Sequence, residues 1–238
     1  MEILSGIEII DLALKIGHTL IISDTHIGHE EAINKQGVFI PRFQFREIIA
    51  RLENIFYKSN TEIETFVING DVKHEFGTIS QTEWRHTLAL LDFIGKHCRN
   101  IIIVKGNHDT VIGQIAEKRN VRIVEQYAFS SRKKRLLLIH GDKIPKLPKC
   151  DVVIIGHQHP AITLREGLRS ETYKCFLKGK YKGKDLIVLP AFTFVSEGTD
   201  VMKEVLSPFL EQDLDEFFVY PVADEAYEFG KIKELRKM

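Results

Sequence analysis

Five short aliphatic runs in this chain each lead directly into residues that can bind metal ions. The third of them, residues 101–105, leads into Gly106-Asn107-His108-Asp109. A run of four or five aliphatic residues predicts a buried strand, and open α/β sheets bind ligands at the carboxyl ends of their strands. The other four runs lead into Asp24 and His26, into Asp71, into His140, and into His157 and His159. A purely structural explanation would require five independent coincidences, so we interpret these residues as one site.

The residue types at these positions indicate the chemistry of the site. An asparagine such as Asn107 offers a carbonyl oxygen to a metal, a histidine such as His108 can transfer a proton near neutral pH, and Asp109 could orient that histidine. Carboxylate, imidazole and amide ligands without thiolate favour Mn²⁺, Fe²⁺ or Zn²⁺ over copper or an iron–sulfur cluster. The sequence therefore predicts a transition-metal site.

Composition excludes several other classes of protein. The chain has 238 residues, with 33 Lys and Arg against 33 Asp and Glu, and three cysteines. A net charge of zero gives no global attraction to nucleic acid or membranes, so any site for a polyanion must be local. The cysteines are far apart and lack Cys-x-x-Cys spacing, which argues against a disulfide framework and a thiolate zinc site. No apolar stretch approaches the roughly 20 residues that span a bilayer, so we expect a cytoplasmic protein without membrane contact.

The spacing of the motifs predicts how the chain is divided. They are spread from Asp24 to His159 and must converge, which predicts a single domain over residues 1–210. Residues 211–238 are expected to form a C-terminal extension. Within it, a terminal helix is expected over residues 223–237, packed on the domain or on a partner.

Two local signals predict elements between and after the motifs. Ser80 and Glu83 have the spacing of a capping box, which predicts the start of a helix. Alternating residues beyond the last motif predict consecutive strands over 161–165, 173–178 and 186–189.

Two further histidines lie beside the motifs and could contact a substrate. His29 opens a predicted short helix just after His26, and His74 lies in the loop after Asp71. Either could bind a substrate phosphate, or could have only a local structural role.

Two basic segments could contact nucleic acid. Lys180, Tyr181 and Lys182 belong to a hairpin of alternating lysines at residues 178–184, which could clamp a phosphate backbone and stack a base. A solvated turn is the simpler interpretation of this hairpin. The other segment is a basic turn at residues 132–135.

Taken in order, the five motifs resemble those of the calcineurin-like metallophosphoesterases. The pattern of that superfamily is Asp-x-His, Gly-Asp, Gly-Asn-His-Asp, a later His and Gly-His-x-His, and all five blocks stand here. Residues 27–30 and 71–77 also resemble the archaeal SbcD-related phosphoesterases, which are similar to bacterial manganese-dependent phosphodiesterases encoded with a DNA ligase and a helicase. The resemblance covers about residues 5–200. It implies an α/β (α+β) fold, a four-layer αββα sandwich of two mixed sheets flanked by helices.

The resemblance also implies a role for each motif residue. It implies seven metal ligands. Asp24, His26 and His159 would bind one metal ion, and Asn107, His140 and His157 would bind the other. Asp71 would bridge the two ions. No ligand position is missing, whereas catalytically dead relatives such as the retromer scaffold subunit have lost ligands. His108 would protonate the leaving oxygen, and Asp109 would fix the orientation of His108.

The leading hypothesis is a binuclear metal-dependent phosphodiesterase acting on single-stranded or structured DNA in repair. Two ions roughly 3.5–4 Å apart can share a hydroxide and clamp a phosphate. We expect Mn²⁺, with Fe²⁺ and Zn²⁺ as alternatives, and a helicase or ligase as possible repair partners. The long capping domain of the double-strand-break nucleases is absent, which argues against processive cleavage of duplex DNA.

Two rival functions stay open at this stage. The same metal pair could hydrolyse small molecules such as phosphomonoesters, cyclic nucleotides or nucleotide conjugates, which a net charge of zero permits. The chain could also be a repair-complex scaffold with incidental activity, although the intact ligand set argues against this. The sequence does not specify the physiological substrate, the native metal or the oligomeric state.

Overall fold

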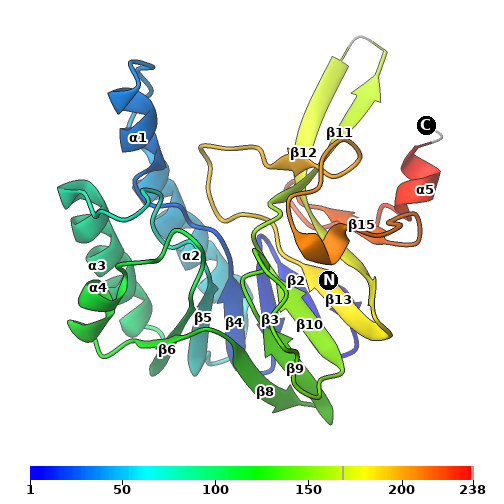
Figure 1. Ribbon diagram of the computed structural model, residues 1–238, viewed down its shortest axis with the longest axis horizontal. Helices are drawn as coiled ribbons and strands as arrows, with labels where there is room; N and C mark the ends of the chain where they lie inside the picture. The colour runs from blue at the N-terminus through cyan, green and yellow to red at the C-terminus, as the bar shows by residue number, and fades with distance from the viewer. Residues whose placement is uncertain (168, 237–238) are drawn as a thin grey trace.

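Two mixed β-sheets lie face to face in the computed structural model, which describes residues 1–167 and 169–236 (Figure 1). In this part of the chain the first sheet has seven strands, β1 to β7 in sequence order: Glu2–Leu4, Ile7–Ile10, Ala13–Ile16, Thr19–Ile22, Thr65–Asn69, Asn100–Val104 and Arg122–Val124. The second sheet has the order β14-β11-β12-β13-β10-β9-β8: Thr199–Asp200, Pro160–Glu166, Arg169–Tyr181, Lys184–Val188, Val152–Ile155, Lys134–Leu138 and Tyr127–Ser131. An eighth strand, β15 (Phe218–Pro221), pairs with β12.

Helices cover the first sheet on its outer face, on the left of Figure 1. The described helices are α1 to α5 and one 3₁₀ turn: His29–Lys35, Gln44–Lys58, Gln81–Gly95, Gly113–Glu117, Ile232–Leu235 and Pro208–Leu210. Apolar side chains at helical spacing on α2 and α3, such as Ile48, Leu52 and Leu91, are buried in the core. The capping box predicted at the start of α3 is confirmed, because Glu83 N donates to Ser80 Oγ and Ser80 N donates to Glu83 Oε2.

The middle of the second sheet is buried on both faces, as in β10, and alternate residues of its strands face different cores. Leu136 and Leu138 of β9 point into the core shared with the first sheet, whereas Leu137 points into a second core. Side chains of the C-terminal segment, including Phe209 and Phe217, complete this second core. The predicted sandwich is therefore confirmed, with loops and short helices in place of long helices on the outer face of the second sheet.

The parallel strands bring the motifs to one edge of the sandwich. Strands β4, β5 and β6 are parallel neighbours in the first sheet, and β9, β10 and β13 are parallel neighbours in the second. The motifs follow β4, β5, β6, β9 and β10. The strands predicted from the aliphatic runs are confirmed, and so are those predicted after His159. Every described helix is too short or too polar to cross a bilayer.

The C-terminal segment differs from its prediction. Of the helix expected over residues 223–237, only Ile232–Leu235 is helical within the described residues, and Lys237 lies outside them. The preceding chain forms β15, which runs antiparallel to β12, and isolated bridges join Val222 to Ala226 and Phe218 to Lys231. Backbone pairing with the sheet thus overrides the helical pattern of residues 223–231.

We expect the substitution Phe217→Ala to lower the free energy of unfolding by about 3–5 kcal/mol, because it empties a buried site in the second core. Phe217 is 3% exposed and packs beneath β12, so the C-terminal segment is part of the domain's core. Denaturant unfolding measures the change. Phe39→Ala is the matched control, since Phe39 is 89% exposed and its loss should change stability by less than about 0.5 kcal/mol. Equal effects of the two substitutions would contradict this packing.

Candidate dinuclear metal centre

Side chains from all five motifs meet beyond the carboxyl ends of β4, β5, β6, β9 and β10. Three groups at this edge each have three potential ligand atoms within 4.8 Å of one another, and two of them consist of predicted ligands: Asp24, His26 and His159, and Asp71, His140 and His157. The third group, His26, His74 and His108, shares His26 with the first. Asn107 adjoins the second group, with its Oδ1 3.0 Å from His140 Nε2. The structure therefore brings together all seven residues predicted from the motifs.

The first group is built around Asp24. The Nε2 atom of His159 lies 3.2 Å from Asp24 Oδ1 and 3.3 Å from His26 Nε2. Asp24 Oδ2 accepts hydrogen bonds from Ser23 Oγ and His157 N, whereas Oδ1 is buried and accepts none. A buried carboxylate oxygen without a donor is costly unless a cation compensates it, so this donor set fits a metal ion.

The second group has the same character. His157 Nδ1 lies 3.2 Å from His140 Nε2, which in turn lies 3.3 Å from Asp71 Oδ2. Two imidazole nitrogens, a carboxylate oxygen and the amide oxygen of Asn107 thus converge on one point. This nitrogen and oxygen set without thiolate also fits a transition-metal ion.

Asp71 lies between the two groups. Its Oδ2 atom is 3.3 Å from His140 Nε2 in one group and 3.8 Å from His26 Nε2 in the other. Its Oδ1 atom accepts a hydrogen bond of 2.9 Å from His108 N, which fixes the carboxylate. Asp24 Oδ1 also lies 3.8 Å from His140, but from its Nδ1 atom, whereas Asp71 Oδ2 faces the Nε2 atoms of both groups, a position suited to a bridging ligand.

Burial and mutual charge shift the pKa values within the centre. Burial and the neighbouring His159 lower the pKa of His26 to about 3. Burial would also lower the pKa of His140, but its hydrogen bond to Asp71 and the charges of Asp24 and Asp71 raise it to about 9. Burial would raise the pKa of Asp24, but the charges of His159 and His140 hold it well below its usual range. The centre therefore keeps its carboxylates ionised, as metal binding requires.

An unusual backbone conformation recurs at the candidate ligands. Five of them have left-handed φ angles between 43° and 61°: Asp24, His26, Asp71, His157 and His159. This conformation is uncommon outside glycine and persists where the surrounding structure enforces it, often at functional sites. Here it turns the backbone sharply at the end of each motif strand, so that side chains from neighbouring motifs point at one another.

The motif glycines leave room for side chains from other motifs. A Cβ on Gly70 would overlap the imidazole ring of His140, and a Cβ on Gly106 would overlap the carboxylate of Asp71. Both glycines therefore serve close approach to a candidate ligand from another strand.

His108 lies beside the centre, and its neighbours differ from the prediction. Its Nδ1 donates to the carbonyl oxygen of His74, which leaves Nε2 free at 3.8 Å from Asp71 Oδ2. Asp109 does not orient His108, because its two carboxylate oxygens accept from Val72 N and Gly106 N at 3.0 and 3.1 Å. The prediction for Asp109 is thus wrong in this respect, and its carboxylate instead holds the loop. Burial and the nearby Asp71 raise the pKa of Asp109 to about 6.

His29 and His74 both lie at the centre, as the sequence allowed. Their rings are stacked, with centroids 4.0 Å apart, and the His74 ring lies 5.5 Å from that of His26 and 5.6 Å from that of His108. Burial and the neighbouring histidines lower the pKa of His29, and they lower that of His74 to about 4. Both imidazoles are therefore neutral at pH 7 and could donate a hydrogen bond to a substrate without adding charge.

Three buried polar residues that support the centre were not found from the sequence. Glu30 Oε1 accepts from the backbone amides of Phe43, the N-cap of α2, and Gln44, its first residue. The side-chain amide of Gln44 donates to the carbonyl oxygen of His26. Glu83 Oε1 accepts from the backbone amides of His74 and the next residue. The only signal in the sequence was the capping box, which identified Glu83 for the helix alone.

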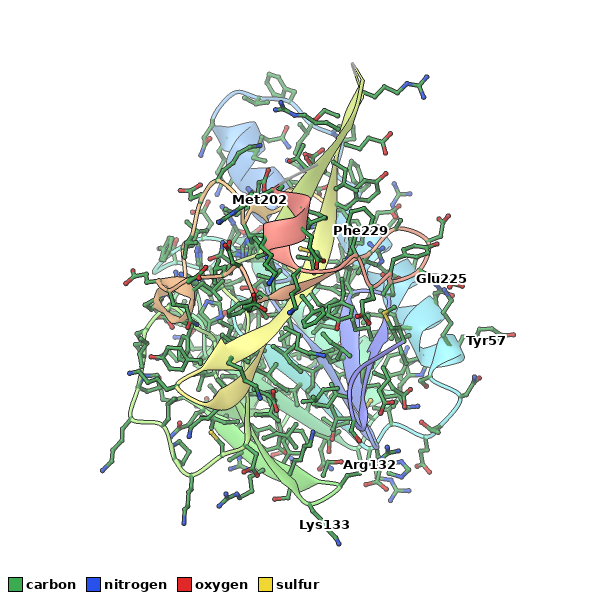
Figure 2. All side chains as sticks on the ribbon, turned by 90° about the vertical axis from the view of Figure 1, so that its right-hand side faces the viewer. Tyr57, Arg132, Lys133, Met202, Glu225 and Phe229 are labelled. Carbon is green, nitrogen blue, oxygen red and sulfur yellow. The ribbon has the colours of Figure 1, made fainter. Side chains whose placement is uncertain are left out.

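The two basic segments lie far from the centre. Arg132 and Lys133 are at the lower end of Figure 2, in the turn before β9, whereas His140 follows the other end of that strand. The turn between β12 and β13 is also distant, because β13 runs parallel to β10 with Asp185 beside Val152, at the start of β10. At about 3.3 Å per residue, that turn lies roughly 20 Å from the motif end of β10.

The base stacking predicted for Tyr181 in the lysine hairpin is wrong. Tyr181 is 6% exposed and packs on Phe209, so its ring has no free face for a base. Lys180 forms an ion pair with Asp185 at 2.6 Å, and the Lys182 ammonium lies over the Tyr181 ring. The lysines are thus held by intramolecular contacts, and the aromatic side chain belongs to the second core.

Comparison with known proteins identifies the family. The calcineurin-like phosphoesterase family matches residues 17–149. The chain is similar in fold to the nuclease MPE of Pseudomonas putida, with a TM-score of 0.62 and 20% identity over 92% of each chain. It is also similar to the E. coli phosphoesterase YfcE, with a TM-score of 0.45 and 16% identity over 85% of this chain and 87% of that one. No curated protein sequence matches significantly. Because the family match spans more than half of the sequence, this chain belongs to the calcineurin-like phosphoesterases, metal-dependent hydrolases of phosphoester bonds.

Proposed function

We propose that this chain is a phosphodiesterase that uses two transition-metal ions and acts on single-stranded or structured DNA. The observation that carries the proposal is the position of Asp71 between two groups of ligands, with His108 beside them. In this proposal Asp24, His26 and His159 hold one ion. Asn107, His140 and His157 hold the other ion.

The bound ions would supply an activated hydroxide and two positive charges facing the phosphate. The chain's own residues perform the remaining steps. Asp71 fixes the spacing of the two ligand groups, and the carbonyl oxygen of His74 fixes the ring of His108. Because Nδ1 keeps its proton in the hydrogen bond to His74, the acid form of His108 is the imidazolium; it holds its Nε2 proton toward the leaving oxygen, transfers it as the ester bond breaks, and is left neutral.

Mn²⁺ is the proposed metal, with Fe²⁺ and Zn²⁺ as alternatives, because the donor set contains carboxylate, imidazole and amide groups. DNA is proposed because the motifs resemble those of DNA-processing enzymes and a protein of similar fold is named a nuclease. The proposed setting is DNA repair beside a helicase or a ligase, on the resemblance of the motifs alone.

A second candidate substrate is a small diester that contains a nucleotide. It is favoured by the position of both basic segments, which lie at the end of the molecule away from the centre. A substrate that contacts only the centre needs neither segment. A pure scaffold is disfavoured by the complete set of ligand side chains.

One panel of substrates tests these candidates. The Mn²⁺-loaded protein should hydrolyse bis(p-nitrophenyl) phosphate and labelled single-stranded DNA faster than p-nitrophenyl phosphate, and chelation should abolish all activity. Elemental analysis should give two metal ions per chain. Cleavage of the monoester alone would overturn the phosphodiesterase proposal, and cleavage of small diesters without DNA would select the second candidate.

Replacing Lys180, Lys182 and Lys184 together by alanine should leave both DNA binding and DNA cleavage unchanged, because this hairpin is remote from the centre. The measurement is affinity for single-stranded DNA at several salt concentrations. Each DNA phosphate that the hairpin binds in the parent protein would add about 0.7 to the slope of log affinity against log salt. The slope measured for the variant would then be smaller by that amount for each lost contact. A reduction of that size would show that DNA reaches the far end of the molecule.

A further inference from the structure

Phe76 places an exposed aromatic ring beside the candidate proton donor. It is 60% exposed, although large apolar side chains are usually buried, and its ring centroid lies 3.7 Å from that of His108. The interplanar angle is 33°, so one face of Phe76 leans on the imidazole. Much of the remaining ring surface faces solvent at the edge of the centre.

The loop that carries Phe76 is held firmly. Glu83 is fully buried, and its carboxylate accepts from three backbone amides of this loop: His74, Glu75 and Ser80. The N–H of His74 is shared between Glu83 Oε1 at 3.2 Å and Ile27 O at 2.9 Å. An exposed phenyl ring is thus kept in a fixed place, which lowers the entropic cost of using it as a contact surface.

The position of His108 defines what this ring can contact. The Nε2 atom of His108 faces Asp71, so a leaving oxygen would lie between this atom and the two ligand groups. The group attached to that oxygen would then lie close to the His108 ring, against which Phe76 packs. An open aromatic face suits a planar ring, and bases stack on aromatic side chains in single-stranded nucleic acid complexes.

We propose that Phe76 is the stacking platform for the base of the nucleoside on the leaving side of the scissile phosphate. The inference rests on the proposed phosphodiesterase function and makes it specific. It requires only one nucleoside, so it applies to DNA and to a small nucleotide diester alike. It also assigns substrate recognition to the loop after β5, in place of the lysine hairpin.

The test compares two short diesters that differ only in one base. The first is a dinucleotide, and the second carries an abasic sugar on the leaving side. Stacking of about 1–3 kcal/mol corresponds to roughly 5- to 150-fold in kcat/KM. Phe76→Ala should lose that factor on the dinucleotide, with the loss confined to the substrate that carries the base.

Three further variants separate stacking from other roles. Phe76→Tyr should restore cleavage of the dinucleotide, whereas Phe76→Leu should not, because leucine could shield His108 but offers no planar face. Tyr57→Ala is the matched control, since Tyr57 is 84% exposed and lies near the end of α2, roughly 20 Å along the helix from Gln44, which contacts His26; Figure 2 shows it at the right-hand edge of the molecule. It should leave both rates unchanged.

Several outcomes would overturn the inference. Equal losses on the two diesters would mean that Phe76 acts only on His108, and no loss on either would mean that nothing stacks there. Rescue by Phe76→Leu would have the same consequence. If the parent protein cleaves the two diesters equally well, the inference fails while the proposed function stands. If it cleaves no diester at all, the proposed function fails and the inference fails with it.

Discussion

Asp71→Ala should lose both metal ions and reduce diester hydrolysis to the background rate. One oxygen of Asp71 faces the Nε2 atoms of imidazoles in both groups, at 3.3 and 3.8 Å, so in the proposed centre its removal takes a ligand from each ion. It also takes away the acceptor for His108 N. Asp71→Asn separates these effects, because it keeps an oxygen for that amide while it removes the negative charge.

Asn107→Ala is the matched comparison for Asp71→Ala. Asn107 touches only the second group, through His140, so its loss should weaken one ion and leave the other bound. Elemental analysis after Mn²⁺ loading and desalting measures both variants, and circular dichroism checks that they are folded. Equal metal content in the Asp71→Ala and Asn107→Ala proteins would argue against the bridging position of Asp71.

The second large effect is expected for His108→Ala, which should keep its metal ions but lose most activity toward poorly activated diesters. A general acid contributes roughly 10²–10⁴-fold when the leaving alkoxide needs a proton. A nitrophenolate leaves without protonation, so hydrolysis of a nitrophenyl ester should fall much less. The ratio of kcat/KM between an alkyl diester and a nitrophenyl diester therefore reports the role of His108.

The same experiment has a clear negative result. If His108→Ala loses the same factor on both substrates, the imidazole stabilises a charge or positions the phosphate, and it is not the acid. Loss of metal from this variant would instead make His108 a ligand. Metal analysis and the two substrates together distinguish these roles.

The candidate ligands could be predicted from the sequence because they are encoded locally. An aliphatic run fixes a strand, the polar residues after it fix the strand's end, and parallel strands bring those ends to one edge. Asp24 and His140 are far apart in the chain, yet both could be placed by this reasoning. The same reasoning predicted the strands, whereas the sandwich was predicted from the resemblance of the motifs to those of a known family.

What sequence reasoning missed depends on contacts between distant backbone and side-chain atoms. The acceptor that orients His108 is the carbonyl oxygen of His74, and every residue type supplies such an oxygen. Asp109 looked like its partner, but two backbone amides satisfy its carboxylate. Tyr181 seemed available to a base, but Phe209 covers it. The local sequence pattern would be the same with or without these contacts, so only the folded structure shows which of them form.

The two motif glycines have a consequence for how such a centre could be designed or transferred to another protein. The imidazole of His140 occupies the space that a Cβ on Gly70 would take, and the carboxylate of Asp71 occupies the space that a Cβ on Gly106 would take. Each glycine is therefore matched in shape to a side chain from a different motif. A designer who grafts one block at a time would leave holes that water or a wrong side chain fills, and would gain nothing from any single step. The five blocks have to be transplanted as one unit, together with the strand spacing that aligns them.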